Sequence, residues 1–297
     1  MKFEGCFTAI VTPFNGTGCK PPIDWDAYEK LLEFQDKNKI DGIIACGTTG
    51  ESPTLSHAEH CRVIEKTVEH SKALVVAGTG SNSTWEAIEL TKEAANAGAH
   101  ASLQVCPYYN KPSQEGLFRH FAAIAEAVDL PMILYNIPGR TSREIAPETM
   151  ARLTEEYSSV IGVKEATGNP EVWREIRDKC GKNFLILSGN DGDTYELMRS
   201  YGAKGVVSVV SNIIPAEMVS FTQLGLAGRF EEMKKEHERL AELFDVMFID
   251  TNPIPVKEAM NRMGIEAGGY RLPMCETSAD KRDNLFKVLE KYGLLEG

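Results

Sequence analysis

Short apolar segments rich in β-branched residues alternate along the whole chain with segments that show helical periodicity. The apolar segments are nearly continuous in hydrophobic residues, which is typical of strands buried on both faces. Between them apolar residues recur at three- and four-residue intervals, which predicts amphipathic helices. The expected strands are residues 6–11, 42–46, 73–77, 101–105, 132–135, 160–163, 184–187 and 205–209. The expected helices that follow them are residues 26–37, 58–70, 84–97, 113–128, 146–157, 170–179, 192–201 and 215–227.

Eight strands that alternate with helices, at the spacing of a βα unit, are the count of a (β/α)8 TIM barrel. A doubly wound open sheet is the alternative, but it more often has fewer strands and a dinucleotide-binding fingerprint. The segment Gly78-Thr-Gly80 lacks the third glycine of that fingerprint. We therefore expect an α/β TIM barrel, with Asn82 and Ser113 as the N-caps of two of its helices.

More chain follows the eighth expected strand than one closing helix requires. Helical patterns at residues 229–248, 252–263 and 280–292 predict a helical extension that packs on the barrel. The expected organisation is a barrel over residues 1–226 and a C-terminal helical region over residues 227–297.

Charge and cysteine content narrow the classes of protein and partner. The 297 residues carry a formal net charge of -11 at pH 7, which disfavours nucleic acid and anionic membranes as partners. No apolar stretch reaches the ~20 residues of a membrane span, and the first residues show no signal or transit pattern. The seven cysteines form no C-x-x-C pair, so we expect reduced, mostly buried thiols in a cytoplasmic protein.

Lys164 follows the apolar run of the sixth expected strand and is the clearest candidate for chemistry. Burial disfavours the charged form of an amine, and a neutral amine can attack a ketone to form a Schiff base. The alternative is a strand-end lysine that extends to solvent or pairs with Glu165. In a TIM barrel the carboxyl ends of the strands form the active-site face, so Lys164 would lie there.

Polar residues follow several other expected strands and would converge on the same rim. The turn at residues 47–51 could bind an anion through backbone N–H groups and hydroxyls, or it could be a plain capped loop before a helix starting at Ser52. Tyr109 and Tyr135 could relay protons or only pack at the rim. Arg140 could bind a carboxylate in bidentate fashion or lie in solvent.

His57, His60 and Glu86 carry side chains that can ligate metals. Two histidines three residues apart, with no carboxylate placed beside them, are a weak metal signal. We expect these side chains on solvated helix faces, and we expect no catalytic metal.

Five motifs in one order resemble those of the 4-hydroxy-tetrahydrodipicolinate synthase (dihydrodipicolinate synthase) family, class I pyruvate aldolases of the N-acetylneuraminate lyase superfamily. The similarity covers nearly the whole chain, from about Phe7 to Leu294. The motifs are Gly47-Thr-Thr-Gly-Glu51, Pro107-Tyr-Tyr-Asn-Lys-Pro112, Tyr135-Asn-Ile-Pro-Gly-Arg-Thr141, Gly162-Val-Lys-Glu-Ala-Thr-Gly-Asn169 and Asn252-Pro-Ile-Pro-Val-Lys257.

The resemblance implies a (β/α)8 barrel and a homotetramer built as a dimer of tight dimers. It also implies an enzyme that condenses pyruvate with L-aspartate 4-semialdehyde, at the first committed step of diaminopimelate and lysine biosynthesis. In this chemistry the Schiff base is the electron sink, so neither a metal nor an organic cofactor is expected.

The same resemblance assigns the catalytic roles. Lys164 would form the Schiff base with pyruvate, and Tyr135 would be the general acid and base beside it. Thr48 would link Tyr135 to Tyr109 in a proton relay, with Tyr109 reaching in from the neighbouring subunit of the tight dimer.

Substrate-binding roles are implied for four further residues. Thr49 and its backbone would hold the pyruvate carboxylate, and Arg140 would meet the carboxylate of the semialdehyde. Val207, where the family often has isoleucine, would line the pyruvate pocket through its backbone carbonyl, and Gly189 is assigned to the same pocket.

Some members of the family bind L-lysine as a feedback inhibitor at the tight-dimer interface, and this chain matches that pattern. Pro53 departs from the commoner alanine. The resemblance implies inhibition by L-lysine, and the alternative is a set of unliganded polar residues at the interface. The matching residues are Ser52, Leu55, His57, His60, Asn82, Glu86 and Tyr108.

Two other interpretations remain. Related barrels with a Schiff-base lysine include N-acetylneuraminate lyase and keto-sugar-acid aldolases or dehydratases, and Arg140 after Pro138-Gly139 distinguishes this chain from the lyase pattern. A catalytically inactive barrel used as a binding module is the alternative of a different class. The joint presence of the lysine, both tyrosines, the threonine and the arginine argues against it, because a scaffold needs no such set.

Overall fold

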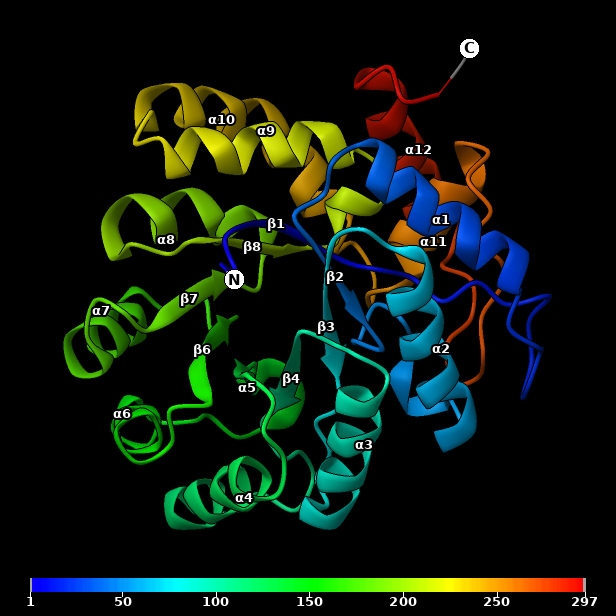
Figure 1. Cartoon of the computed structure of the whole chain (residues 1–297). Helices are drawn as coiled ribbons and strands as arrows, with labels where there is room; N and C mark the ends of the chain where they lie inside the picture. Colours follow the sequence, from blue (N-terminus) through cyan, green and yellow to red (C-terminus); the bar gives the residue numbers. More distant parts are fainter. Residues whose placement is uncertain (1, 296–297) are drawn as a thin grey trace.

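The computed structural model describes residues 2–295, and in it eight parallel strands close into one barrel in sequence order (Figure 1). The strands are β1 (Gly5–Ala9), β2 (Gly42–Ala45), β3 (Leu74–Gly78), β4 (Ala101–Val105), β5 (Met132–Asn136), β6 (Val160–Glu165), β7 (Leu185–Ser188) and β8 (Gly205–Ser208). Strand β1 pairs with both β2 and β8, which completes the closure. The predicted (β/α)8 TIM barrel is confirmed.

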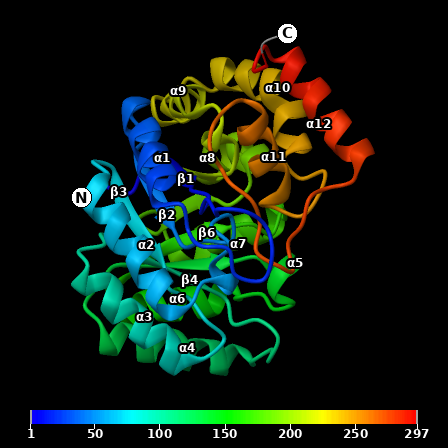
Figure 2. The same ribbon diagram turned by 90° about the vertical axis from the view of Figure 1, so that its right-hand side faces the viewer.

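Helices connect the strands and form an outer layer around the barrel (Figures 1 and 2). The longer ones are α1 (Trp25–Lys37), α2 (His57–His70), α3 (Thr84–Asn96), α4 (Gln114–Ala127), α6 (Pro147–Glu156), α7 (Pro170–Cys180), α8 (Thr194–Tyr201) and α9 (Pro215–Leu226). Short helical turns lie close to strand ends and are α5 (Pro138–Thr141), η1 (Ser52–Thr54), η2 (Asp191–Asp193) and η3 (Val210–Asn212).

Apolar side chains from alternate strand positions fill two layers, which explains the near-continuous hydrophobic runs. One layer lies inside the barrel and includes Phe7, Ile44, Leu187 and Val207. The other lies between the sheet and the helices and is the larger of the two. Burial of the strands on both faces is the main hydrophobic contribution to this fold.

The seam between β1 and β8 requires glycine. Gly5 pairs with Gly205, and a Cβ atom added to Gly205 would lie 1.8 Å from the carbonyl oxygen of Gly5. Both residues also have positive φ angles, +101° and +152°, which favour glycine over other residues. Next to the seam the Thr8 hydroxyl donates to the Ser211 hydroxyl at 2.8 Å, so strand pairing and side-chain bonds close the barrel together.

Most predicted boundaries differ from the observed ones by one or two residues. The sixth strand is longer than expected, because it continues through Lys164 and Glu165. The prediction that Asn82 caps helix α3 is wrong, since the Ser83 hydroxyl accepts from the backbone N–H of Glu86. Ser113 caps α4 as predicted, by accepting from the N–H of Gly116.

Up to residue 295 three helices follow the barrel, namely α10 (Phe230–Val246), α11 (Ile254–Arg262) and α12 (Ala279–Lys291). Helix α10 packs against α9, and α12 packs against both α10 and α11 (Figure 2). The division into domains at residues 226 and 227 stays a prediction, and its outer limits at residues 1 and 297 lie outside the described residues. None of the helices within residues 2–295 combines the length and the apolar character of a membrane span.

The seven cysteines are all free thiols, but the expectation that most of them are buried is wrong. Cys6, Cys46 and Cys106 lie at or just after strand positions and are buried. Cys19 and Cys275 are exposed because they lie in loops outside the barrel core. The remaining two are partly buried at helix positions.

Candidate active site

Strand pairing between β5 and β6 brings Tyr135 and Lys164 side by side at the carboxyl ends of the strands. Lys164 is 7% exposed, and its Nζ lies 4.1 Å from the centroid of the Tyr135 ring. Within residues 2–295 no carboxylate forms an ion pair with this amine. A buried, unpaired lysine beside a phenol is the arrangement that a nucleophilic amine needs.

The alternative that Lys164 pairs with Glu165 does not hold in the structure. Successive residues of a strand point to opposite faces, so the two side chains diverge. The Glu165 carboxylate accepts from the side chain of Asn136 at 3.1 Å and from the backbone N–H of Thr167 at 2.7 Å. Burial raises the pKa of Glu165 to about 7, and these hydrogen bonds oppose that shift.

A cavity of about 420 Å³ opens at this rim, and Lys164 and Tyr135 are among its lining residues. Thr48, Thr49 and Arg140 line the same cavity. Sequence reasoning placed these five side chains together, and the fold brings them together. Cavities of a few hundred Å³ with convergent polar groups are typical small-molecule sites.

The loop after β2, residues 47–51, contributes both threonines. Thr49 is buried and its hydroxyl accepts from the side-chain amide of Asn252 at 3.0 Å, whereas Thr48 is half-buried. The N–H groups of Gly50 and Glu51 bond to carbonyls inside the loop, but among the described residues those of Thr48 and Thr49 have no acceptor. These two free N–H groups and two hydroxyls suit a carboxylate. The alternative of a helix starting at Ser52 is partly right, because η1 begins there, although α2 is capped by Ser56.

Arg140 lies in the short helix α5, four residues past the end of β5. Arg140 is an exposed residue, and its guanidinium donates to the backbone carbonyl of Asn252 at 3.4 Å. The guanidinium therefore keeps most of its donors available at the cavity, as recognition of a second carboxylate would require.

Three other predicted site residues lie outside the lining of the cavity. Tyr109 is 89% exposed, with a φ angle of +72°, and is not part of the cavity lining that contains Lys164 of its own chain. Val207 is buried in the inner layer of the barrel. Gly189 follows β7 and donates its N–H to the carbonyl of Glu165 at 2.7 Å, and a Cβ there would lie 2.6 Å from that of Ala166.

Most of the residues predicted to bind L-lysine line the same cavity. The His57 ring lies 2.8 Å from the Glu86 carboxylate, and hydrogen bonding from Ser81 and then His57 lowers the pKa of Glu86. The lining includes Ser52, Leu55, His57, His60, Glu86 and Tyr108. Asn82 adjoins them, since its amide donates to the carbonyl of Tyr108 at 3.2 Å.

The expectation that His60 lies on a solvated helix face is wrong. His60 is buried, its Nε2 lies 2.9 Å from the carbonyl oxygen of Gly78, and burial lowers its pKa. A neutral ring with Nε2–H donating to that carbonyl fits this geometry. Within residues 2–295 no group of three His, Cys, Asp or Glu side chains could hold a metal ion.

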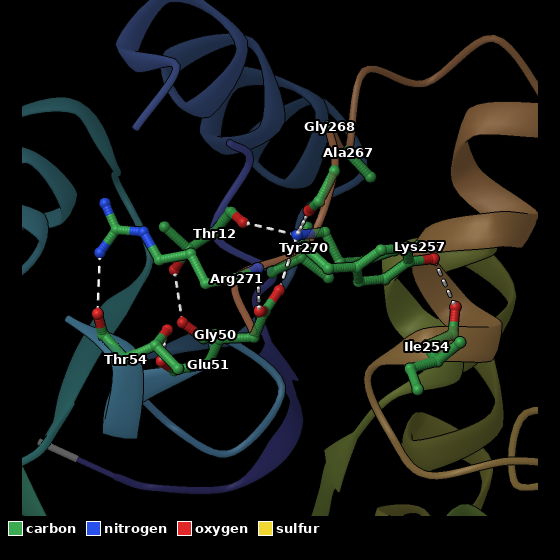
Figure 3. A network of polar contacts seen from close by, with 12 residues as sticks. Thr12, Gly50, Glu51, Thr54, Ile254, Lys257, Ala267, Gly268, Tyr270 and Arg271 are labelled. Atoms are coloured by element: carbon green, nitrogen blue, oxygen red, sulfur yellow. Dashed lines mark hydrogen bonds and ion pairs between the residues drawn. The ribbon is translucent and has the colours of Figure 1, made fainter. Parts of the chain in front are cut away.

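Sequence reasoning missed a buried polar network between the loop 47–51 and the C-terminal segment (Figure 3). Lys257 of α11 donates to the Glu51 carboxylate at 2.8 Å, and the backbone N–H of Arg271 donates to the same carboxylate at 3.2 Å. The sequence indicated residues 252–257 as part of an expected helix and as one of the five family motifs, with no buried partner for Lys257. The available signal was a lysine directly after Ile254-Pro-Val256 on an otherwise apolar helix face.

Comparisons with known proteins agree along nearly the whole chain. The model of the dihydrodipicolinate synthetase family matches residues 2–292. The chain is 49% identical to a 4-hydroxy-tetrahydrodipicolinate synthase of Sulfurihydrogenibium sp. (strain YO3AOP1), over 99% of this chain and 100% of that protein.

Two solved structures are also similar to the chain. A chloride-inhibited dihydrodipicolinate synthase from Acinetobacter baumannii complexed with pyruvate is 40% identical, with a TM-score of 0.95, over 99% of this chain and 100% of that one. A dihydrodipicolinate synthase from Cyanidioschyzon merolae with lysine bound is 41% identical, with a TM-score of 0.93, over 99% of both chains.

Proposed function

Because the chain belongs to the dihydrodipicolinate synthetase family, we propose that it condenses pyruvate with L-aspartate 4-semialdehyde through a Schiff base on Lys164. It is an enzyme of the lyase class with a TIM-barrel fold, and its relatives act in lysine and diaminopimelate biosynthesis. The observation that carries the proposal is the buried, unpaired Lys164 with Nζ 4.1 Å from the Tyr135 ring.

The chemistry starts at the amine. Lys164 attacks C2 of pyruvate, and loss of water gives an imine that acidifies the methyl group. Removal of a methyl proton gives an enamine, whose carbon attacks the aldehyde of the semialdehyde. The amino group that came from the semialdehyde then attacks the imine carbon, which closes the ring and releases the amine of Lys164. Tyr135, which pairs with Lys164 across the two strands, would transfer the protons of these steps, and Thr48 lines the same cavity.

Two carboxylates need separate partners in this reaction. The free N–H groups of the loop 47–51 and the Thr49 hydroxyl would hold that of pyruvate, and Arg140 would hold that of the semialdehyde. The Val207 carbonyl and Gly189 would complete the pyruvate pocket. No metal or organic cofactor is part of this proposal, because the imine itself is the electron sink.

Borohydride reduction in the presence of pyruvate tests the proposal. The protein should gain one pyruvate, less one water plus two hydrogens, on Lys164, as peptide mass spectrometry would record. Absence of this adduct would remove every Schiff-base mechanism and leave the inactive binding module. A coupled assay that compares the semialdehyde with sugar aldehydes then separates the synthase from the related lyases and aldolases.

We further propose that Tyr109 acts in a neighbouring subunit of a homotetramer. The ring is 89% exposed, and Trp85 and Tyr108 are also among the exposed large apolar side chains, which a second copy could cover. Sedimentation across a dilution series measures the fraction of dimer. An assay at the same protein concentrations should show that activity per subunit falls as the dimer dissociates. A fully active monomer would contradict the role in trans. The cytoplasmic location stays a prediction.

Inhibition by L-lysine is the regulatory part of the proposal. The cluster around His57 and Glu86 offers a carboxylate to an ammonium group and shares one cavity with Lys164. Calorimetric titration with L-lysine should give binding heat and a parallel loss of activity, and Glu86→Gln should remove both. D-lysine is the matched control ligand. Activity that is indifferent to saturating L-lysine would leave these residues as unliganded polar groups.

A further inference from the structure

Lys257 is buried completely, yet every donor of its ammonium group has an acceptor (Figure 3). Its Nζ donates to the carbonyl of Thr12 at 3.0 Å, to the carboxylate of Glu51 at 2.8 Å, and to the carbonyl of Gly269. Burial lowers the pKa of Lys257, and the charge of Glu51 opposes that effect. Three acceptors around one ammonium group define a single position for it.

The other end of this network is the loop 47–51, which is held at three consecutive residues. Asn252 donates to the Thr49 hydroxyl at 3.0 Å, and the Thr12 hydroxyl donates to the carbonyl of Gly50 at 2.8 Å. Glu51 has a left-handed backbone, with φ of +53°, and its carboxylate receives the two bonds from the C-terminal segment. The partners thus fix the strained end of the loop next to its free N–H groups.

Arg271 makes the anchor on the C-terminal side rigid. Its guanidinium is fully buried and donates to Glu59 at 2.7 Å and to the carbonyls of Pro21 and Thr54. The backbone N–H that reaches Glu51 is therefore held in place by side-chain bonds of the same residue. Helix α2, which carries Glu59, and the C-terminal segment form one frame around the loop.

Net stability does not account for such a network. Replacing a buried ion pair by apolar residues of similar volume is often neutral or stabilising, because desolvation offsets the attraction. An ion pair adds a defined direction and distance, which apolar packing does not. Thr49 lies two residues before Glu51, and Asn252 contacts both Thr49 and, through its carbonyl at 3.4 Å, Arg140.

We propose that Lys257 and Asn252 are positioning residues that set the loop 47–51 and Arg140 for the two substrate carboxylates. This inference rests on the proposed function, because it assigns the loop to pyruvate. Neither residue lines the cavity, so each acts through another group. The C-terminal helical segment is then part of the active-site construction.

Borohydride trapping across a pyruvate series tests this inference. Lys257→Met leaves the Glu51 carboxylate buried and unpaired, so the loop should shift and the pyruvate concentration for half-maximal trapping should rise about tenfold or more. Trapping at saturating pyruvate should still reach one adduct per chain, on Lys164. Asn252→Leu, which removes only the donor to Thr49, should give a smaller rise of a few-fold.

Glu258→Gln is the matched control, because Glu258 follows Lys257 in α11 and pairs instead with Arg282 at 3.2 Å. It should leave the pyruvate dependence unchanged. If Lys257→Met does not fold, Glu51→Gln replaces it, since its amide oxygen can still accept from Lys257 while the charge and the second acceptor, which receives the N–H of Arg271, are lost. The same rise in the pyruvate concentration for half-maximal trapping is expected.

A merely structural role would lower the unfolding temperature of the variants and reduce the trapped amount, with no change in the pyruvate concentration for half-maximal trapping. That result overturns the inference. Absence of any adduct on the unaltered protein instead overturns the proposed function, so the two failures are distinguishable.

Discussion

Two buried lysines, one on the rim of the barrel and one on helix α11, show opposite solutions to the same physical problem. Lys257 is 0% exposed and satisfied by a carboxylate and two carbonyls. Lys164 is 7% exposed, lies over the ring of Tyr135 and, in the described part of the chain, forms no ion pair. Both side chains are buried, but among the described residues only Lys257 has a carboxylate beside its amine.

The comparison shows how one fold can use a lysine side chain both as a fixed structural residue and as a proposed nucleophile. An ammonium group held by three acceptors has no lone pair to offer and no freedom to move. Lys164, by contrast, lies over the ring of Tyr135 and lines a cavity, where a substrate carbonyl can reach it. The hydrogen-bond partners, rather than burial alone, distinguish the two roles. Four experiments test this distinction.

The largest expected effect is on activity. Lys164→Met should lower kcat by about 10⁴-fold or more, because the covalent step has no substitute nucleophile, and pyruvate trapping should vanish. A coupled assay and intact-protein mass measure the two losses. Lys257→Met is the control, since it should still be trapped at saturating pyruvate. Equal loss of trapping in both variants would contradict distinct roles.

The second effect is on stability, and its order is reversed. Lys257→Met should cost about 3–5 kcal/mol, because it leaves the Glu51 carboxylate buried without its cation. Lys164→Met should change the free energy of unfolding by less than about 1 kcal/mol, since no ion pair is broken. Urea unfolding of both variants at one protein concentration measures this. A larger loss at Lys164 would show that it too is structurally paired.

The third effect extends the comparison to the carboxylates. Glu51 has a buried cation, whereas Glu165 has only hydrogen bonds, and burial raises its pKa from 4.5 to about 7. A raised folded-state pKa means that the folded protein holds the proton more tightly than the unfolded chain. Its contribution to stability is therefore complete below pH 4.5 and lost as the pH rises through 7, a difference of about 3 kcal/mol.

Glu165→Gln should remove this slope, whatever its effect on stability at one pH. Urea unfolding at pH 5 and pH 8, for the variant and the unaltered protein, gives the slope directly. An unchanged slope in the variant would mean that another group titrates in this range.

The smallest expected effect concerns the neighbour of Lys164. Tyr135→Phe keeps the ring against Nζ but removes the hydroxyl, so the rate of adduct formation should fall about 10²-fold while the adduct still forms. Stopped-flow mixing followed by borohydride quenching measures this rate. Tyr157→Phe, on a tyrosine bonded to Glu126 on the outer helices, should leave the rate unaltered. An unaltered rate in Tyr135→Phe would limit the phenol to packing.

Much of the fold and the centre of the site could be predicted from the sequence, because both depend on local patterns. The strands were found from their continuous apolar runs, since a parallel barrel buries both faces of each strand. Once the strands are placed, Lys164, Tyr135 and the loop 47–51 converge by topology alone. Helix caps were less certain, as Asn82 and the true cap Ser83 have equally suitable side chains.

The partners of charged groups could not be predicted in this way. The bond between Lys257 and Glu51 joins residues 206 positions apart, and neither local periodicity nor spacing indicates it. His60 shows the same limit, because its helix exposes His57 but turns His60 toward Gly78. Which face of a helix meets the barrel depends on long-range packing that a single sequence does not contain.

The network around Glu51 also has a consequence for how the protein is made. A ribosome releases the loop 47–51 long before Lys257 and Arg271, so the nascent chain carries the loop without its anchors. Strand β1 likewise waits for β8 before both of its edges are paired. Truncated products of interrupted translation that end between Lys164 and Lys257 thus keep the lysine of the site but lack the segment that holds the loop.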